Sequence, residues 1–135
     1  SVDSVRIVNA LDRAAARALD DGDRPAPLRV YIQVSLDGDV QRGGVDVDDA
    51  GSVDVVCAAA EAGEGLEFVG LMALPPLGAD PDEAFGRLQS ELARVQRAYP
   101  RRLELSAGMS GDLEAAVKHG STCVRVGPRY WDNVL

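Results

Sequence analysis

Residues 105–117, LSAGMSGDLEAAV, concentrate small residues where an apolar stretch gives way to a helical pattern. Ser106, Gly108, Met109 and Ser110 all lie within this change of pattern. Small residues let the backbone approach a ligand closely, and the free N–H groups at a helix amino terminus favour negative charge. The segment is therefore compatible with an anion site, and it is equally compatible with an ordinary strand-to-helix turn.

Few other residues carry distinctive chemistry. Cys57 and Cys123 are far apart and outside CxxC spacing, which gives no support to a metal or dithiol site, and their apolar neighbours predict two buried, inert thiols. His119 is the only histidine, which excludes a metal site built on two histidines, and its place near the end of a helical stretch predicts a capping role. Lys118, the only lysine, is expected at the surface in the same last turn.

Length and composition predict one soluble globular domain, because the chain has 135 residues, of which 46% are hydrophobic and 27% charged. The net charge of -8 argues against a nucleic-acid partner, since binding to polyanions relies on clustered Lys and Arg. No apolar run is long enough for a membrane span, and no signal-peptide pattern is readable. We therefore expect a cytoplasmic protein without a membrane partner.

Apolar strand patterns alternate with helical patterns along the chain. Strands are predicted over residues 28–36, 66–74, 102–107 and 123–127, and helices over residues 5–19, 53–62, 81–99 and 111–119. In the third helix Asp80 is expected as the cap and Pro81 at the first position, and Gly120 is expected to close the fourth helix. The alternation predicts an α/β fold of parallel βα units, and strands that are apolar nearly throughout predict a sheet covered on both faces.

The loops differ between the two edges of the predicted sheet. Those that follow the strands are distinctive, whereas the opposite connections are short polar turns. Because ligand sites in α/β folds lie at the carboxyl ends of the strands, function is predicted at that edge of a barrel-like set of strands. The acidic residues 46–54 are interpreted as a solvated turn and the start of a helix.

Three segments in order carry a resemblance to a known family. They are VYIQVSLDGDVQRGGV at residues 30–45, FVGLMALPPLGADPDEAFGRLQSEL at residues 68–92 and LSAGMSGDLEAAVKHGSTCVRVG at residues 105–127. They resemble the pyridoxal phosphate homeostasis protein family, which is related to the alanine racemase N-terminal domain. The resemblance covers nearly all of residues 1–127.

The resemblance implies a (β/α)8 barrel of the TIM type that holds pyridoxal 5'-phosphate, PLP, at its mouth. Since such a barrel typically needs about 250 residues, residues 1–127 are expected to form its later half. Residues 1–4 are then the end of the fourth barrel strand, and the four predicted strands are the fifth to eighth. Residues 128–135 depart from the family pattern and are expected to form a divergent tail, in which Pro128 replaces a small hydroxyl residue.

The resemblance also assigns the cofactor-binding residues. Phosphate ligands are implied at Ser106 and Ser110 through their side chains, at Gly108 and Met109 through close backbone approach, and at Gly127 through its N–H. Arg125 is implied to reach the pyridine nitrogen of PLP, where a permanent cation would weaken the cofactor as an electron sink. From the residues alone, an Arg125 that points outward to a helix acid is equally compatible.

The implied function is PLP homeostasis, in which the protein carries or buffers the cofactor without amino-acid turnover and is not an enzyme. The implied partners are PLP and PLP-dependent apo-enzymes, and the complete family fold is expected to be a monomer. The family's Schiff-base lysine lies on an early strand with no counterpart in this chain, and Lys118 does not replace it by position. Two alternatives stay open, namely a PLP-dependent racemase or lyase, and a non-binding barrel fragment that needs missing strands or a partner chain.

Overall fold

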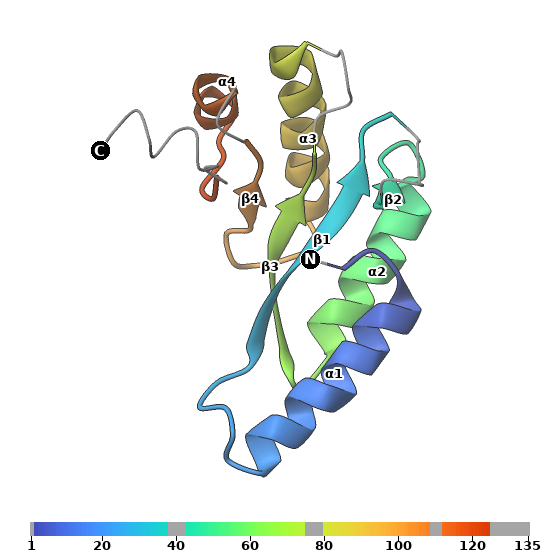
Figure 1. Ribbon diagram of the computed structural model, residues 1–135. Coiled ribbons are helices and arrows are strands. Elements are labelled where there is room, and N and C mark those ends of the chain that lie inside the picture. The colour runs from blue at the N-terminus through green and yellow to red at the C-terminus, as the bar shows by residue number, and fades with distance from the viewer. Residues whose placement is uncertain (1, 38–42, 75–79, 109–111, 125–135) are drawn as a thin grey trace, which may run out of the picture.

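The computed structural model describes residues 2–37, 43–74, 80–108 and 112–124, which form a parallel sheet flanked by helices (Figure 1). The strands are β1 (Leu28–Ser35), β2 (Val45–Asp46), β3 (Leu66–Met72) and β4 (Glu104–Ser106). The helices are α1 (Val5–Asp20), α2 (Ala50–Ala62), α3 (Pro81–Gln96) and α4 (Leu113–Lys118). The sheet order is β2-β1-β3-β4, and every neighbouring pair is parallel. The predicted alternation of strands and helices in a parallel α/β fold is confirmed.

Two isolated parallel bridges extend the sheet at its ends, Val2 with Ile32 and Ser106 with Cys123. A strand is predicted over residues 123–127, of which only Cys123 and Val124 are among the described residues. The bridge at Cys123 is the part of this strand that can be compared with the prediction. The predicted strand over residues 102–107 is also shorter, at Glu104–Ser106.

The sequence pattern does not predict β2. This two-residue strand pairs with Val34 and Ser35, beyond the place where the segment at Val2 pairs with Ile32. A pair of residues is too short to carry a hydrophobic period, so only the long-range pairing with β1 reveals it. The acidic segment interpreted as a solvated turn therefore begins inside the sheet, at Asp46.

Local capping explains where the helices begin. Ser4, Asp49 and Asp80 are the N-caps of α1, α2 and α3, and each side chain accepts a hydrogen bond from a backbone N–H of its first turn. Because Asp49 caps α2, that helix begins at Ala50, three residues before the predicted start. Pro81 occupies the first turn of α3 as predicted, and Gly120, with a φ of 91°, follows the end of α4.

The core lies between the sheet and the helices. Val30, Ile32 and Val34 of β1 are at most 2% exposed and belong to the same buried cluster as Phe85 and Leu88 of α3. The intervening β1 residues include exposed Arg29 and half-buried Tyr31 and Gln33. The predicted covering of both faces therefore holds for β3, which is buried at every position except Glu67, and is wrong for β1, whose second face is polar and partly exposed.

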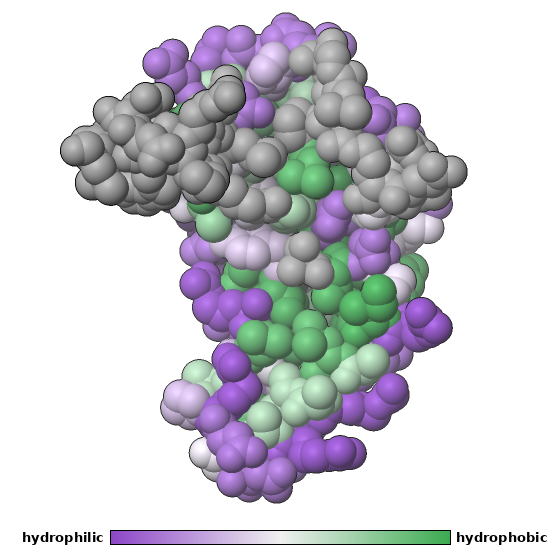
Figure 2. All heavy atoms as spheres, in the orientation of Figure 1, coloured by the Kyte–Doolittle hydropathy of each residue, from purple (hydrophilic) through white to green (hydrophobic). Residues whose placement is uncertain are grey.

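A continuous group of hydrophobic side chains lies on one face of the molecule, over α1 and next to it, with hydrophilic side chains around it (Figure 2). Ile7 of α1 is 43% exposed, which is high for a large aliphatic side chain. None of the helices in the described part of the chain is long and apolar enough to cross a membrane.

Candidate functional site at the strand carboxyl ends

The carboxyl end of β4 is followed by Ala107 and Gly108, and α4 packs against this end of the strand. Ser106 ends the strand and is 4% exposed, and Gly108 has a φ of 105°, a conformation that side-chain-bearing residues rarely adopt. A Cβ atom at Gly108 would lie 2.5 Å from the Cβ of Ala116, which is fully buried in α4. Glycine is therefore required at position 108 for α4 to pack against the strand end.

The segment after α4 returns to β4 and fixes this turn from the other side. The Ser121 hydroxyl donates to the Ala107 carbonyl at 2.7 Å, and Ala107 N–H donates to the Cys123 carbonyl at 3.0 Å. Thr122 N–H donates to the Leu105 carbonyl at 2.8 Å. Sequence reasoning treats Ser121 as part of a polar turn and misses this contact, because a serine after a helix-ending glycine carries no signal of its long-range partner.

The neighbouring strand ends meet β4 at the same edge of the sheet. Ala73 N–H, just after β3, donates to the Ser106 carbonyl at 3.2 Å. At the end of β1, the Ser35 hydroxyl donates to Asp37 at 3.1 Å, and a small cavity beside them is also lined by Gln33 and Leu74. The described strand ends therefore bring hydroxyl, carboxylate and amide groups to the edge where function is predicted.

A second set of polar side chains lies across the sheet, two residues before Ser106 on β4. Register aligns Tyr31 of β1 with Gly70 of β3, and Gly70 with Glu104 of β4. The Tyr31 hydroxyl donates to Glu104 Oε2 at 2.9 Å, and Arg29 Nη2 donates to the same oxygen at 3.1 Å. Because Gly70 has no side chain, Tyr31 and Glu104 meet across β3.

Burial is the main cause that raises the pKa of Tyr31 to about 12, and its hydrogen bond to Glu104 raises it further. The neutral phenol is therefore favoured in the folded state, and this contribution to stability is present below the ordinary tyrosine pKa of about 10 and is lost as the pH rises towards 12.

We expect Glu104→Gln to lower the pKa of Tyr31, because the substitution removes the negative charge beside the phenol. Titration followed by tyrosinate absorbance measures the shift, with Tyr31→Phe identifying the signal. Glu114→Gln, on α4, serves as the matched control and leaves the titration unchanged. An identical Tyr31 titration in the Glu104→Gln variant would contradict the assigned contact.

The structure brings together two of the predicted site residues, Ser106 and Gly108, on one strand end. The other four lie outside the described residues, namely Met109, Ser110, Arg125 and Gly127. Their proposed contacts with the cofactor stay predictions.

Lys118 and His119 lie at the end of α4, as expected. The Lys118 side chain is 70% exposed and its Nζ is 3.6 Å from Asp82 on α3. His119 Nε2 is 3.2 Å from the same carboxylate, and its Nδ1 is 3.1 Å from Gln89. Both side chains therefore join α4 to α3, and the surface position predicted for Lys118 is confirmed.

The two cysteines differ. Cys57 is fully buried, as predicted, and burial raises its pKa to about 12, which keeps the thiol protonated. Cys123 is exposed, so the prediction of a second buried thiol is wrong. Its apolar sequence neighbours suggest burial, but within the described residues it is bridged to β4 only at Ser106.

Residues 1–128 match the family model described as "Alanine racemase, N-terminal domain". The chain belongs to the alanine racemase N-terminal domain family. This assignment agrees with the resemblance carried by the motifs and with the parallel α/β architecture.

Named relatives within this family are similar along nearly the whole chain. The chain is 64% identical over 127 residues to the pyridoxal phosphate homeostasis protein of Mycobacterium tuberculosis. The aligned segment covers 94% of this chain and 49% of the relative. It is 47% identical over 134 residues to the protein of the same name from Corynebacterium glutamicum, covering 98% of this chain and 59% of the relative. The chain thus spans about half the length of these relatives.

A solved family structure has the same fold. PipY of Synechococcus elongatus PCC7942, determined with PLP bound, is 31% identical to this chain and superposes with a TM-score of 0.76. The match covers 96% of this chain and 58% of PipY. This likeness agrees with the parallel α/β fold predicted from the sequence, which is confirmed.

Proposed function

We propose that this chain is part of a PLP-binding protein of cofactor homeostasis, which carries or buffers PLP without turning over amino acids. The observation that carries the proposal is the turn at Gly108, which packs α4 against the strand end beside Ser106. Small residues and a helix beginning at a strand carboxyl end suit a phosphate group. The PLP bound to the related PipY and the names of the closely similar relatives support the same cofactor.

The described residues fit the phosphate part of PLP. Ser106 supplies a hydroxyl at the strand end, and the missing side chain at Gly108 leaves room for Ala116, so that α4 lies close to this strand end. In the proposal Met109, Ser110 and Gly127 complete the phosphate contacts, and Arg125 binds the pyridine nitrogen. PLP, when bound, supplies an aldehyde and an electron-accepting ring, and a cation at the ring nitrogen weakens the second property.

This chain is proposed to hold PLP without a covalent bond. Its only lysine, Lys118, is on the last turn of α4, solvent-exposed and close to Asp82 rather than at the strand ends. A nucleophilic lysine needs a desolvated pocket or a neighbouring cation that lowers its pKa. We place the covalent lysine in the additional length of the relatives, and this chain in the later half of their barrel, with residues 128–135 as a divergent tail.

The proposal has consequences for partners. PLP-dependent apo-enzymes are the proposed recipients of the cofactor, and the complete protein is proposed to act as a monomer in the cytoplasm.

His119, the sole histidine, contacts Asp82 and Gln89 on α3, so the proposal assigns it no acid–base role.

Equilibrium dialysis of the full chain against PLP and against pyridoxal tests the phosphate site. The Lys118→Arg variant serves as the background, so that the exposed amine cannot react with the aldehyde. We expect PLP to bind at least about tenfold more tightly than pyridoxal, because charge-assisted hydrogen bonds to phosphate are among the stronger ones. Ser106→Ala should reduce this ratio.

Ser90→Ala is the matched control, because Ser90 is exposed on α3. Equal affinity for PLP and pyridoxal, or an unchanged ratio in Ser106→Ala, would contradict the phosphate assignment.

A further inference from the structure

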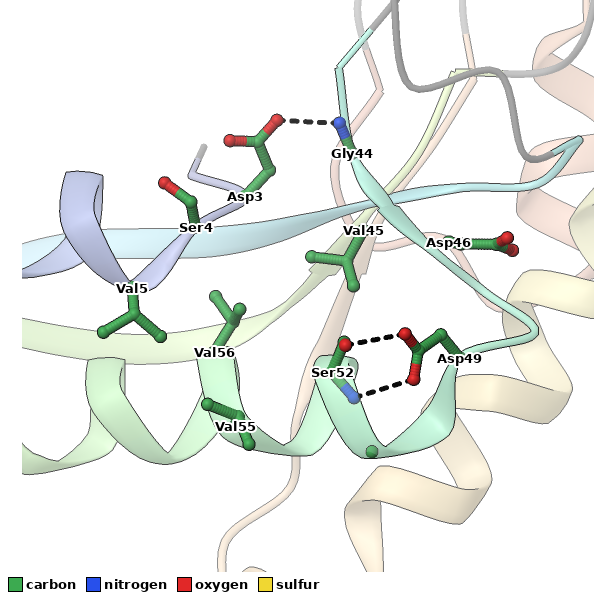
Figure 3. A pocket seen from close by; sticks show the side chains of 11 residues that line it. Asp3, Ser4, Val5, Gly44, Val45, Asp46, Asp49, Ser52, Val55 and Val56 are labelled. Carbon is green, nitrogen blue, oxygen red and sulfur yellow. Dashed lines mark hydrogen bonds between the residues drawn. The ribbon is translucent and has the colours of Figure 1, made fainter.

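A groove of about 810 Å³ lies between the amino ends of α1 and α2 and the edge strand β2 (Figure 3). Val5 of α1, Val45 of β2, and Val55 and Val56 of α2 line it, and Figure 3 shows Val55 and Val56 between Val5 and Val45. Asp3 and Asp49 lie on opposite sides of these valines. We refer to this feature as the valine groove.

The valine groove combines a buried floor with one exposed aliphatic side chain. Val45 and Val56 are 9% and 5% exposed and so belong to the core, whereas Val55 is 58% exposed. Val55 is one of four large hydrophobic residues exposed in the described part of the chain. Covering Val55 would remove apolar surface from water without any rearrangement of the floor beneath it.

The charged groups of the valine groove are all acidic. Its lining includes Asp3, Asp46 and Asp49, and none of the described lining residues is a Lys, Arg or His. Asp3 accepts a hydrogen bond from Gly44 N–H at 2.8 Å, and Asp49 accepts from Ser52 N–H and Oγ at 3.1 and 2.7 Å. These bonds hold the Asp3 and Asp49 carboxylates on either side of the valines, and those to Asp49 lower its pKa, which keeps it ionised.

We propose that the valine groove is a docking site for a protein segment that places a leucine-like side chain on Val55 and Val56 and an arginine or lysine beside Asp3 or Asp49. The charge pattern selects this occupant, because a cation complements the carboxylates while an aliphatic group covers the valine surface. The same pattern disfavours a second copy of the chain, since a two-fold contact would bring acidic groups together on a protein of net charge -8.

The position of the valine groove relates it to the candidate cofactor site. In parallel βα units the amino ends of the helices and the carboxyl ends of the strands lie at the same edge of the sheet. The amino ends of α1 and α2 therefore place a docked segment at the edge that carries Ser106. The proposal goes beyond the proposed function and does not rest on it, because it concerns only the surface at the valine groove.

Three synthetic peptides test the proposal on the full chain: GRLLRG, GELLEG with the charges reversed, and GRSSRG without the aliphatic residues. Binding is followed through the NMR signals of the valine methyl groups. We expect GRLLRG to shift the signals of Val45, Val55 and Val56 and to bind more tightly than the other two peptides. Added salt should weaken its binding, because Asp49 is exposed to solvent and Asp3 is only half-buried.

Single substitutions identify the groups responsible. Val55→Ser should weaken GRLLRG binding about fivefold, because it removes most of the exposed apolar contact. Asp49→Asn retains an N-cap acceptor for α2 while it removes the charge, and should weaken binding about twofold. Val117→Ser is the matched control, since Val117 is 62% exposed on α4, outside the valine groove, and should leave the affinity unchanged.

Three results would overturn the proposal: no shift at the groove valines with GRLLRG, equal shifts with all three peptides, or unchanged affinity in Val55→Ser. A dimer in sedimentation experiments that Val55→Ser dissociates would instead make a second copy the occupant. Thermal unfolding of each variant, followed by circular dichroism, establishes that the comparisons are made between folded proteins.

Discussion

Gly70→Ala should destabilise the fold by about 3 kcal/mol, because the new methyl group has no room between β3 and β4. A Cβ atom at Gly70 would lie 1.8 Å from the carbonyl oxygen of Glu104. That oxygen belongs to the backbone, so no side-chain rotation relieves the overlap. Separation of the two strands would break the pairing of Leu71 with Leu105, both nearly fully buried.

Urea unfolding measures the effect of Gly70→Ala, and Gly51→Ala is its matched control. Gly51 lies on the exposed face of α2, where an added Cβ meets only Asp49 Oδ1 at 3.8 Å. Alanine is favoured over glycine inside a helix, so the control should be neutral or stabilised by up to about 1 kcal/mol. Equal midpoints for the two variants would show that β4 does not pack against Gly70 as described.

The loss of packing between β3 and β4 in Gly70→Ala should also affect the candidate site. Ser106 ends β4, and its carbonyl accepts a hydrogen bond from Ala73 just beyond β3. A strand displaced from Gly70 carries Ser106 with it, and the contact between Tyr31 and Glu104 across β3 is lost as well. We therefore expect the preference of the chain for PLP over pyridoxal to fall in Gly70→Ala.

The fold class is predictable from the sequence because its signals are local. The apolar runs of β1 and β3 and the caps Asp80 and Gly120 each act within a few residues, and the structure has these elements close to their predicted limits. Element ends depend on tertiary contacts and differ more. α3 ends at Gln96, three residues before the predicted limit, and the side-chain amide of Gln96 donates to the Tyr99 carbonyl at 3.2 Å in the turn that follows the helix.

The candidate site is only partly predictable for the same physical reason. The small residues from Ser106 to Gly108 lie close together in the chain and draw attention to this strand end, while their role as phosphate ligands is implied by the family resemblance and stays a prediction. The contacts of Ser121 with Ala107 and of Tyr31 with Glu104 join residues that are 14 and 73 positions apart in the sequence. A local sequence pattern does not predict such long-range pairs. The exposure of Cys123 likewise depends on what packs around it and not on its apolar neighbours in the sequence.

Gly108→Ala should reduce the affinity of the chain for PLP by at least about tenfold, while affecting pyridoxal much less. Two costs arise at this position, because the φ of 105° disfavours any side chain and a Cβ would lie 2.5 Å from that of Ala116. α4 must then move away from the strand end, and the phosphate contacts proposed beside Ser106 lose their geometry. Dialysis against both ligands, in the Lys118→Arg background, measures the ratio.

Two further variants separate these costs. Gly22→Ala has only the conformational cost, because Gly22 has a φ of 77° and an added Cβ there meets nothing within 4 Å. It should lose about 1 kcal/mol of stability and retain the preference for PLP. Ala116→Gly removes the methyl group that the new Cβ at position 108 would strike, at a cost of about 1 kcal/mol for a glycine within a helix.

Gly108→Ala combined with Ala116→Gly should therefore recover part of the lost PLP preference, although each single change is unfavourable. A positive coupling of this kind is expected for groups that are in contact or share a local backbone shift, so it reports the packing of α4 on the strand end and not general stability. Additive losses in the double variant would mean that this packing does not control phosphate binding. Recovery would instead place the PLP phosphate at the junction of β4 and α4.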